Sequence, residues 1–184
     1  MRSIIVGFAG KIGSGKTTVS AAVAEALNWR YTSFGAYVRE IAQQRGRGES
    51  RTTLQEIGAS LVANPDELCR SVLAQVAWKP GMNVIMDGIR HAEIVDSLRR
   101  VTVPSAVYLI YIRIDDAERI RRQTAREIIS NREISGYDSH TTEADAKSVL
   151  PSMADIVIDG SLPVSENIER VVSWLQDNSS SKRY

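Results

Sequence analysis

The sequence predicts an α/β fold in which about five mostly parallel strands form one sheet with helices on both faces. Short apolar runs rich in β-branched residues alternate along the chain with segments whose apolar residues recur at helical spacing. Continuous apolar runs of this kind are typical of parallel strands buried between two helical layers. The length of 184 residues suits one domain, and the chain shows no repeat and no long linker.

The first five elements follow from local patterns. Residues 4–8 form a short apolar run that predicts a buried first strand. Residues 17–27 place apolar side chains at helical spacing between small alanines, and residues 30–33 predict a short second strand. Residues 35–44 and 53–62 predict two helices, because a loop rich in glycine and charge separates them.

A proline and an aspartate mark the elements in the middle of the chain. Pro65 predicts the start of a helix that runs to about Trp78, since proline is favoured at the first helical position. A turn is expected at residues 79–81, and residues 84–86 predict a third buried strand that ends at Asp87. The next segment, to about residue 99, is expected to be helical.

The last part of the chain begins with the longest strand candidate, residues 106–114. Asp115 and Glu118 predict a capping box for a helix that runs through Arg126. The remaining expectations are a mobile polar loop at 131–142, a last strand at 156–158, an amphipathic closing helix around 168–175 and a frayed tail at 179–184.

A complete G-x-x-x-x-G-K-[ST] motif connects the first strand to the helix that follows it. Its glycines allow consecutive backbone N–H groups to turn inward around a phosphate chain, and the helix N-terminus adds positive potential. Lys16 is expected to reach the β- and γ-phosphates, and Thr17 to offer its hydroxyl to Mg²⁺. A chance match in a glycine-rich turn is the alternative, but the flanking strand and helix argue against it. The expected nucleotide-binding residues are Gly10, Lys11, Gly13, Ser14, Gly15, Lys16, Thr17 and Thr18.

A nucleotide–Mg²⁺ site of this kind also needs an acidic partner on a neighbouring strand. Asp87 ends the third strand and precedes a glycine, so we expect it to hold the metal together with Thr17. A turn or helix-capping aspartate is the alternative. Arg39 follows the second strand and Arg90 the third, and two converging guanidinium groups are what a second, phosphate-bearing substrate requires. Each arginine by itself is equally consistent with a solvated surface charge.

Three arginines recur at i, i+3 and i+7 on the helix after the fourth strand, at positions 119, 122 and 126. In phosphoryl transfer, arginines carried by a lid stabilise the charge on the transferred group. We therefore expect Arg122 and Arg126 to be catalytic, together with Lys16 and Asp87. The alternative is a solvated helix face whose arginines pair with the acidic residues around them.

Charge and cysteine content exclude several classes of protein. Lys and Arg number 23 and Asp and Glu 22, which gives a net charge of +1 and argues against a protein that coats nucleic acid. The single cysteine, Cys69, excludes a disulfide framework and indicates a reducing compartment. The longest apolar runs are far shorter than the ~20 residues that span a bilayer. We therefore expect a cytoplasmic protein without a membrane partner.

With these motifs the chain resembles, along almost its whole length, the P-loop kinases that phosphorylate nucleotides and other small metabolites. Residues 35–42 look like the segment after the second strand of cytidylate kinases, which implies that Arg39 contacts the acceptor phosphate. Residues 87–90 are similar to the Asp-Gly-x-x-Arg element of adenylate kinases, one residue shorter, which implies the same contact for Arg90. Residues 154–161 look like the last strand and following loop of these kinases, which implies that Gly160 lies near the donor adenine.

The chain departs from the pattern of each individual family. Adenylate kinases usually carry an aspartate where this chain has Ala36, and their long lid is absent. The phosphate loop also looks like that of dephospho-coenzyme A kinases, but the aspartate that this family places after its second strand is missing at residues 31–34. Phage-type deoxynucleotide kinases are similar in layout as well, so the resemblance leaves the acceptor open.

The sequence thus predicts a P-loop NTPase three-layer sandwich with a short lid. We expect a single kinase domain over residues 1–178, with an acceptor-binding helical insert at about 35–78 and the lid at about 115–142. The expected function is transfer of the γ-phosphoryl group of Mg-ATP to a nucleoside or deoxynucleoside monophosphate, with ATP and Mg²⁺ as cofactors. The alternatives are a dephospho-coenzyme A kinase-like enzyme, a kinase for a modified base in nucleic acid, and a regulatory ATPase. We expect a monomer or homodimer that acts on a small molecule and not on nucleic acid.

Overall fold

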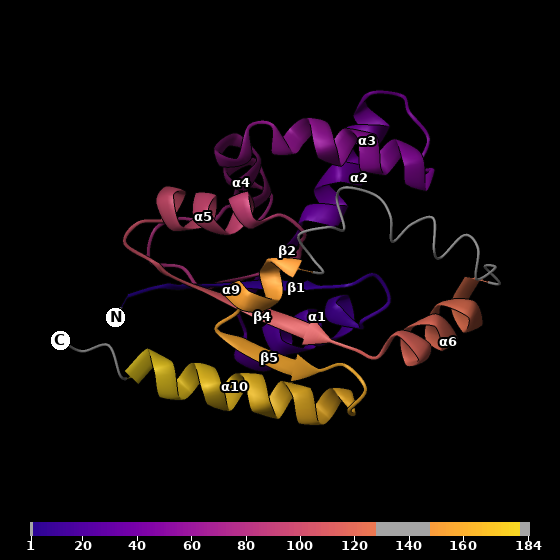
Figure 1. The fold of residues 1–184 in the computed structure, drawn as a ribbon. Helices are drawn as coiled ribbons and strands as arrows, with labels where there is room; N and C mark the ends of the chain where they lie inside the picture. Colours follow the sequence, from indigo (N-terminus) through magenta and orange to yellow (C-terminus); the bar gives the residue numbers. More distant parts are fainter. Residues whose placement is uncertain (1, 128–147, 181–184) are drawn as a thin grey trace.

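The computed structural model describes residues 2–127 and 148–180, and it confirms the predicted α/β fold (Figure 1). Five parallel strands form one sheet in the order β2–β3–β1–β4–β5. Because the chain starts in the central strand and moves first to one side and then to the other, the carboxyl end of β1 is a switch point where ligands bind in such sheets. The strands are β1 (Ile4–Gly10), β2 (Arg30–Ser33), β3 (Val84–Ile89), β4 (Ala106–Arg113) and β5 (Ile156–Asp159).

Helices cover both faces of the sheet, which gives three layers. Helices α1 and α10 pack side by side on one face, and α4, α5 and α9 cover the other (Figure 1). Helices α2 and α3 pack on each other beyond the end of the sheet. The helices are α1 (Lys16–Leu27), α2 (Phe34–Gln44), α3 (Arg51–Val62), α4 (Pro65–Ala74), α5 (Ala92–Val101), α6 (Asp116–Glu127), α9 (Leu150–Met153) and α10 (Val164–Ser180).

The central strand β1 supplies both halves of the core. Ile5 and Ala9 point to the layer of α4 and α5, while Val6 and Phe8 point to α1 and α10. All four side chains are completely buried. This two-sided burial is the reason that the strand has an uninterrupted apolar sequence instead of an alternating one.

Helix α4 ends earlier than the sequence predicts. It stops at Ala74 and not at Trp78, because Ala77 takes a left-handed conformation with φ of 46°. The Trp78 N–H then donates to the Leu73 carbonyl at 3.1 Å, which closes the helix end. The apolar spacing continues past this point because Trp78 folds back against the core.

The predicted capping box at the start of α6 forms only in half. The Asp115 carboxylate accepts from the backbone N–H of Ala117 at 2.8 Å and from that of Glu118 at 3.4 Å. In the reciprocal half of such a box, Glu118 would reach back to the capping residue. Its carboxylate instead accepts from Arg121 and Arg122, so that part of the prediction is wrong.

Some expectations fall on parts of the chain that lie outside the described residues. These are the loop at 131–142, most of the lid and the last four residues of the tail. Ser179 and Ser180 extend α10, and the short helix α9 has no counterpart in the sequence prediction. The limits of the domain, insert and lid stay predictions. Within the described ranges, no helix is long and apolar enough to cross a membrane.

Candidate functional site

The glycine-rich loop lies between β1 and α1 and packs tightly against the neighbouring strand. Gly10 has a φ of 151°, and a Cβ atom added there would lie 2.7 Å from the Ile112 carbonyl oxygen of β4. Gly13 and Gly15 have φ of 83° and 86°, a region that residues with a side chain rarely adopt. The loop therefore requires glycine for close approach as well as for backbone conformation, as the motif predicts.

Two polar side chains of the loop point to an anion. Lys16 is buried, and its Nζ donates to the Lys11 carbonyl oxygen at 3.4 Å, so the ammonium lies along the loop. The Ser14 hydroxyl is buried and has no hydrogen-bond partner among the described residues. A phosphate chain seated on the loop would accept from both groups and from the N-terminus of α1, where Thr18 lies exposed in the first turn. The residues present therefore fit a nucleotide.

The acidic partner expected on a neighbouring strand lies next to this loop. Asp87 pairs in register with Phe8 of β1 and is 3% exposed. The Thr17 hydroxyl donates to Asp87 Oδ2 at 2.7 Å, whereas Asp87 Oδ1 is buried and lacks a hydrogen-bond partner in the described part of the chain.

A hydroxyl and a carboxylate are the oxygen donors that Mg²⁺ prefers, with the substrate phosphates and water as its other ligands. The described residues contain no group of three His, Cys, Asp or Glu side chains that could hold a metal by themselves. Thr17 and Asp87 therefore fit Mg²⁺ bound together with a nucleotide, and not a metal held by protein alone.

Tyr31 is a member of this site that the sequence analysis missed. Its hydroxyl donates to Asp87 Oδ2 at 3.4 Å, from strand β2. Burial, followed by the negative charge of Asp87, raises the pKa of Tyr31 to about 12, so the hydroxyl remains a donor at neutral pH. No local sequence signal could have found this contact, because it depends on the pairing of β2 with β3.

A cavity of about 460 Å³ lies beside the glycine loop, between α2, α3 and the end of β3. Arg39 and Arg90 both line it, so the structure brings together the two arginines that the sequence placed behind separate strands. The Nη1 atom of Arg39 lies 3.8 Å from the Cβ position of Gly35, so this guanidinium lies over the start of α2. Ile12 of the loop forms part of the same lining, and the apolar walls are formed by Phe34, Val38, Leu54, Val62, Leu68, Ile89 and Ile94.

Helix α3 adds polar residues to this cavity that the sequence analysis did not single out. Arg51 and Gln55 line it from one face of the helix, one turn apart, and Glu49 lines it from the preceding loop. The signal in the sequence was the position of Gln55 at i, i+3 and i+7 with Gly58 and Val62, a helix stripe that would contain no polar residue if it faced the core.

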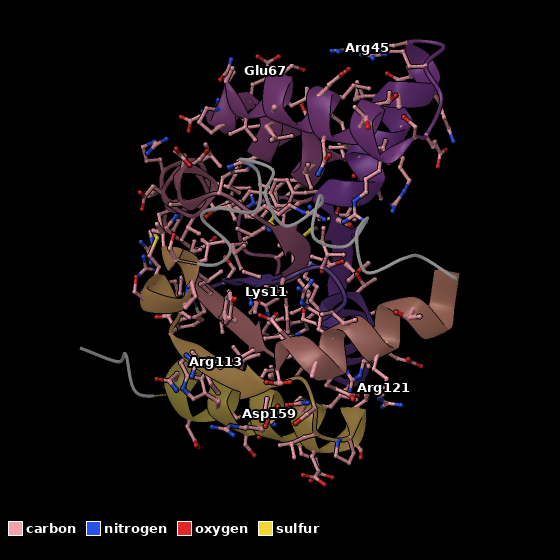
Figure 2. All side chains as sticks on the ribbon, turned by 45° about the vertical axis from the view of Figure 1, so that its right-hand side comes forward. Lys11, Arg45, Glu67, Arg113, Arg121 and Asp159 are labelled. Atoms are coloured by element: carbon pink, nitrogen blue, oxygen red, sulfur yellow. The ribbon has the colours of Figure 1, made fainter. Side chains whose placement is uncertain are left out.

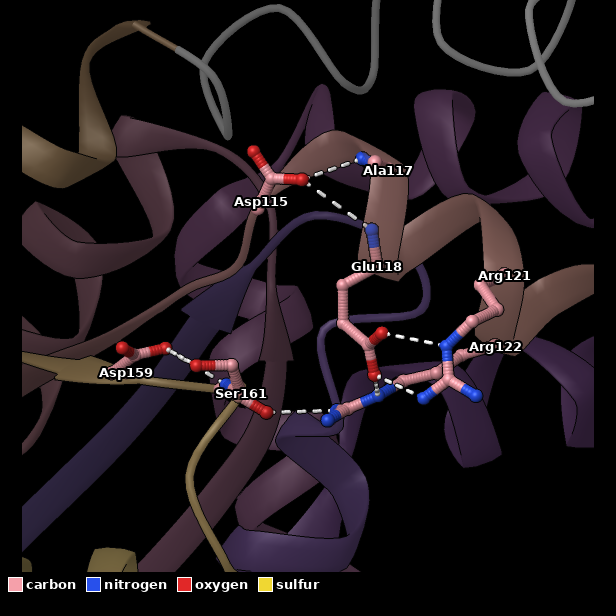
Figure 3. A network of polar contacts seen from close by, with 8 residues as sticks. Asp115, Ala117, Glu118, Arg121, Arg122, Asp159 and Ser161 are labelled. Carbon is pink, nitrogen blue, oxygen red and sulfur yellow. Dashed lines mark hydrogen bonds and ion pairs between the residues drawn. The ribbon is translucent and has the colours of Figure 1, made fainter.

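The arginines of α6 have different surroundings. Arg122 donates from Nε to Glu118 at 2.7 Å and from Nη1 to the Gly160 carbonyl at 2.8 Å (Figure 3). Its Nη1 also lies 3.8 Å from the Cβ position of Gly15, so the guanidinium borders the glycine loop. Arg119 is 2% exposed and donates to Asp116 at 3.0 Å, which is a structural contact. The side chain of Arg126 lies outside the described residues.

Ion pairs hold α6 against the loop. Lys11 Nζ donates to both oxygens of Asp116, at 2.9 and 3.1 Å, and Figure 2 shows Lys11 between α6 and the helices α2–α4. The hydrogen bond from Lys11 lowers the pKa of the Asp116 carboxyl. Hydrogen bonds from Arg121 and then Arg122 lower the pKa of Glu118 to about 2. The salt bridges that the sequence analysis considered as an alternative role for these arginines are therefore present. Arg122 forms such a salt bridge and also borders the glycine loop.

Gly160 lies where no side chain fits. A Cβ atom there would be 2.7 Å from the Ser14 carbonyl oxygen and 3.1 Å from that of Arg113. The turn after β5 thus packs directly on the glycine loop, and Arg122 holds it from the other side. The glycine loop, the turn after β5 and helix α6 therefore form one contiguous surface.

Comparisons with known proteins show which family this chain resembles. A family model described as an AAA domain matches residues 6–140. The chain is 29% identical over 154 residues to a UPF0200 protein of Aeropyrum pernix, covering 79% of this chain and 81% of that protein. It is 35% identical over 85 residues to a putative adenylate kinase of Thermococcus onnurineus (46% and 40% covered). It is 26% identical over 193 residues to a cytidylate kinase of Lysinibacillus sphaericus (99% and 83% covered).

Solved structures share the fold at low sequence identity. The APS kinase of Mycobacterium tuberculosis in complex with AMPPNP and APS superposes with a TM-score of 0.65 at 16% identity, covering 95% of this chain and 98% of that one. The shikimate kinase of Aquifex aeolicus gives a TM-score of 0.60 at 16% identity, covering 96% and 99%. Identities this low establish a common fold and leave the acceptor open.

Proposed function

Because this chain belongs to the AAA domain family and is a P-loop kinase, we propose that it transfers the γ-phosphoryl group of ATP to a nucleoside or deoxynucleoside monophosphate. The observation that carries the proposal is the composition of the cavity beside the glycine loop. It joins arginines to an apolar lining, which suits a molecule with an anionic end and a flat, weakly polar body. The names of two relatives, adenylate kinase and cytidylate kinase, support the same acceptor class.

The apolar part of the cavity lining suits a nucleotide base. Eight aliphatic or aromatic side chains line the cavity, and the six polar or charged ones are Arg39, Glu49, Arg51, Gln55, Arg90 and His91. A planar heterocycle buries its faces against the apolar side chains and needs partners only at its edge.

The charged groups suit an acceptor that is already ionised. Arg39 and Arg90 both line the cavity and would hold a phosphate, since guanidinium groups bind phosphate oxygens in a bidentate manner. A hydroxyl acceptor would need a carboxylate base beside it. Glu49 is the one carboxylate among the described residues that line the cavity, and it already accepts from Gln43 Nε2 at 2.8 Å.

The donor side of the proposal rests on the glycine loop. Lys16 and the loop N–H groups would hold the β- and γ-phosphates, and Arg122 borders the loop near where charge develops in transfer. Thr17 and Asp87 would hold Mg²⁺, which neutralises phosphate charge in reactions of this class. Transfer between two bound anions then depends on orientation and charge stabilisation, without a general base.

The test is acceptor-dependent formation of ADP from ATP in the presence of Mg²⁺. The panel contains ribo- and deoxynucleoside monophosphates, nucleosides, dephospho-coenzyme A, a polyol acid and short DNA, with the Lys16→Ala variant as the control for contaminating activity. We expect one or a few monophosphates to stimulate turnover at least tenfold and to yield the corresponding diphosphate. Stimulation by a hydroxyl acceptor alone, or ATP hydrolysis that no acceptor changes, would contradict the proposal.

A further inference from the structure

The carboxylate of Glu118 binds two arginines in the first turns of α6. Its Oε1 atom accepts from Arg122 Nε at 2.7 Å and from Arg121 Nη2 at 2.8 Å, and its Oε2 atom accepts from Arg121 Nε at 2.7 Å (Figure 3). Arg121 thus holds the carboxylate through the two-point contact that guanidinium groups form with carboxylates. The side chain of Glu118 is therefore fixed by a partner other than Arg122.

Arg122 is held at two separate nitrogen atoms of its guanidinium group. Glu118 binds Nε, and the Gly160 carbonyl oxygen accepts from Nη1 at 2.8 Å. Two anchors on a rigid, planar group fix its plane, which keeps Arg122 beside Gly15 of the glycine loop. The Nη2 atom has no hydrogen-bond partner within residues 2–127 and 148–180, so its N–H groups are available to a phosphate oxygen.

The pair of Glu118 with Arg122 is less exposed than the salt bridges on the outer surface. Its side chains are 25% and 31% exposed, whereas those of Asp96 and Arg99 on α5 are 55% and 46% exposed. Fully solvated pairs contribute little, because water screens the charges and the side chains lose conformational freedom. Lower exposure strengthens the attraction between the charges, so the Glu118–Arg122 pair is suited to holding one geometry.

The three charges leave an excess of positive charge beside the glycine loop. Hydrogen bonds from Arg121 and then Arg122 lower the pKa of Glu118 to about 2, so the carboxylate is ionised at neutral pH. Glu118 alone would cancel the charge of Arg122, and the guanidinium of Arg121 restores one positive charge to the group. Glu118 can therefore orient Arg122 without removing the positive potential that stabilises developing negative charge.

We propose that Glu118 is a positioning residue for phosphoryl transfer, which acts by holding Arg122 in the orientation that meets the transferred group. The inference rests on the function proposed above. An arginine stabilises developing charge best when it is oriented before transfer begins, because no reorganisation is then required during the reaction. Without the carboxylate, Arg122 keeps only its contact with the Gly160 carbonyl. The loss then falls on the rate of transfer more than on the binding of ATP.

A double-mutant cycle tests whether Glu118 acts through Arg122. The kcat and the KM for ATP are measured for the wild type, Glu118→Gln, Arg122→Ala and the double variant, each with the monophosphate that the wild type uses best. Glutamine has the shape of glutamate but lacks its charge and one acceptor oxygen, so it cannot bind both arginines in the same way. Glu25→Gln is the control, because Glu25 is an exposed glutamate at the end of α1 opposite the glycine loop.

We expect Glu118→Gln to lower kcat about 10-fold and Arg122→Ala about 100-fold, with the KM for ATP within about threefold of the wild-type value. In the Arg122→Ala background, Glu118→Gln should change kcat less than about twofold, because the group through which it acts is already absent. Glu25→Gln should retain the wild-type constants. Glu118→Asp, which shortens the reach to Arg122, replaces Glu118→Gln in the cycle if the glutamine variant does not fold.

Binding without turnover supplies a second measurement. ADP bound with Mg²⁺ and aluminium fluoride imitates the group in transfer, so its affinity relative to that of ADP alone measures stabilisation of the transfer state. We expect this affinity ratio to fall about tenfold in Glu118→Gln. Arg122→Ala and the double variant should give equal ratios, since Glu118 has no effect without its arginine.

The outcomes separate the inference from the proposed function. An equal loss of kcat from Glu118→Gln in the presence and in the absence of Arg122 would overturn the inference and leave the proposed function intact. An unchanged kcat and affinity ratio in Glu118→Gln, or an equal loss in Glu25→Gln, would do the same. Failure of every monophosphate to stimulate the wild type would instead overturn the function itself.

Discussion

At the scale of single residues, the site depends on polar groups that are only partly satisfied by protein. Asp87 Oδ2 accepts hydrogen bonds from the hydroxyl groups of Thr17 and Tyr31. Its other oxygen, Oδ1, is buried and has no hydrogen-bond partner in the described part of the protein. Ser14 and Gln55 also hold buried polar atoms without a described partner. Three of the four described residues with such an atom therefore lie where ligands are proposed to bind, and the fourth, Asn167, belongs to helix α10.

Arg90→Ala tests the acceptor end of the cavity. Loss of a charge-assisted contact to phosphate is expected to raise the acceptor KM about 10- to 100-fold while the KM for ATP changes less than about threefold. Steady-state kinetics with both substrates varied measures the two constants. Arg99→Ala is the control, since Arg99 is an exposed arginine of α5 that pairs with Asp96 and does not line the cavity. Equal losses for ATP and acceptor would contradict the assignment.

Tyr31→Phe tests the hydrogen bond to Asp87 through the pH dependence of stability. The pKa of Tyr31 is about 12 in the folded protein, compared with the ordinary value of 10.0 that applies to the unfolded chain. The folded state therefore holds this proton more tightly than the unfolded chain does. The resulting stabilisation is complete below pH 10 and is lost as the pH rises to about 12. Denaturant unfolding from pH 9 to 12 should show a smaller fall in the unfolding free energy for Tyr31→Phe than for the wild type. Identical slopes would contradict the contact.

At the scale of elements, the glycine loop is held between strand β4 and the turn after β5. Gly10 approaches the Ile112 carbonyl of β4, and Gly160 approaches the Ser14 carbonyl from the other side. Arg122 links α6 to the same turn through its bond to the Gly160 carbonyl. The loop therefore keeps its shape through backbone contacts that side chains at these two glycines would disrupt.

Gly160→Ala tests this packing. The added methyl group would lie 2.7 Å from the Ser14 carbonyl oxygen, so the loop or the turn must move. We expect a loss of about 1–3 kcal/mol in unfolding free energy and at least a tenfold weaker binding of ATP. Chemical denaturation and titration of a fluorescent ATP analogue measure the two effects. Gly48→Ala is the matched control, because open space surrounds that position. Wild-type ATP binding in Gly160→Ala would show that the turn does not shape the loop.

At the scale of the whole molecule, the two proposed binding regions lie at the carboxyl end of one sheet but on different elements. The glycine loop, proposed to bind the donor, lies between β1 and α1, whereas the cavity proposed to hold the acceptor is built mainly from α2, α3 and the end of β3. Strand β3 connects the two regions, because Asp87 lies in this strand next to the glycine loop and Arg90 directly follows its end at the cavity. A ligand in either region would thus stabilise the sheet that carries the other.

Mg-ATP should therefore stabilise the folded protein as a whole. At a concentration of 100 times the dissociation constant, the unfolding free energy is expected to rise by about 2.7 kcal/mol. Thermal unfolding of the wild type and of Lys16→Ala, each with and without Mg-ATP, measures this effect. The Lys16→Ala variant should unfold at nearly the wild-type temperature without ligand and gain little from Mg-ATP. An equal gain in both proteins would contradict the role of Lys16.

Much of the architecture could be predicted before any tertiary contact was known. The alternation of apolar runs with helical spacing predicted each of the five strands, and the glycine motif identified the loop and Lys16. Predictions failed where a non-local contact overrode a local pattern. Trp78 folds back on the core and ends α4 early, and the arginines of α6 draw Glu118 away from its place in the capping box.

The sequence by itself determined the order of the elements and the chemistry of the loop, because backbone conformation and apolar periodicity are local properties of the chain. Tertiary structure decided which distant side chains meet. The pairing of β2 with β3 brings Tyr31 to Asp87, and the packing of α3 on α2 brings Gln55 into the cavity with Arg39. Strand register and helix rotation depend on how whole elements pack on one another, so no short stretch of sequence specifies these contacts.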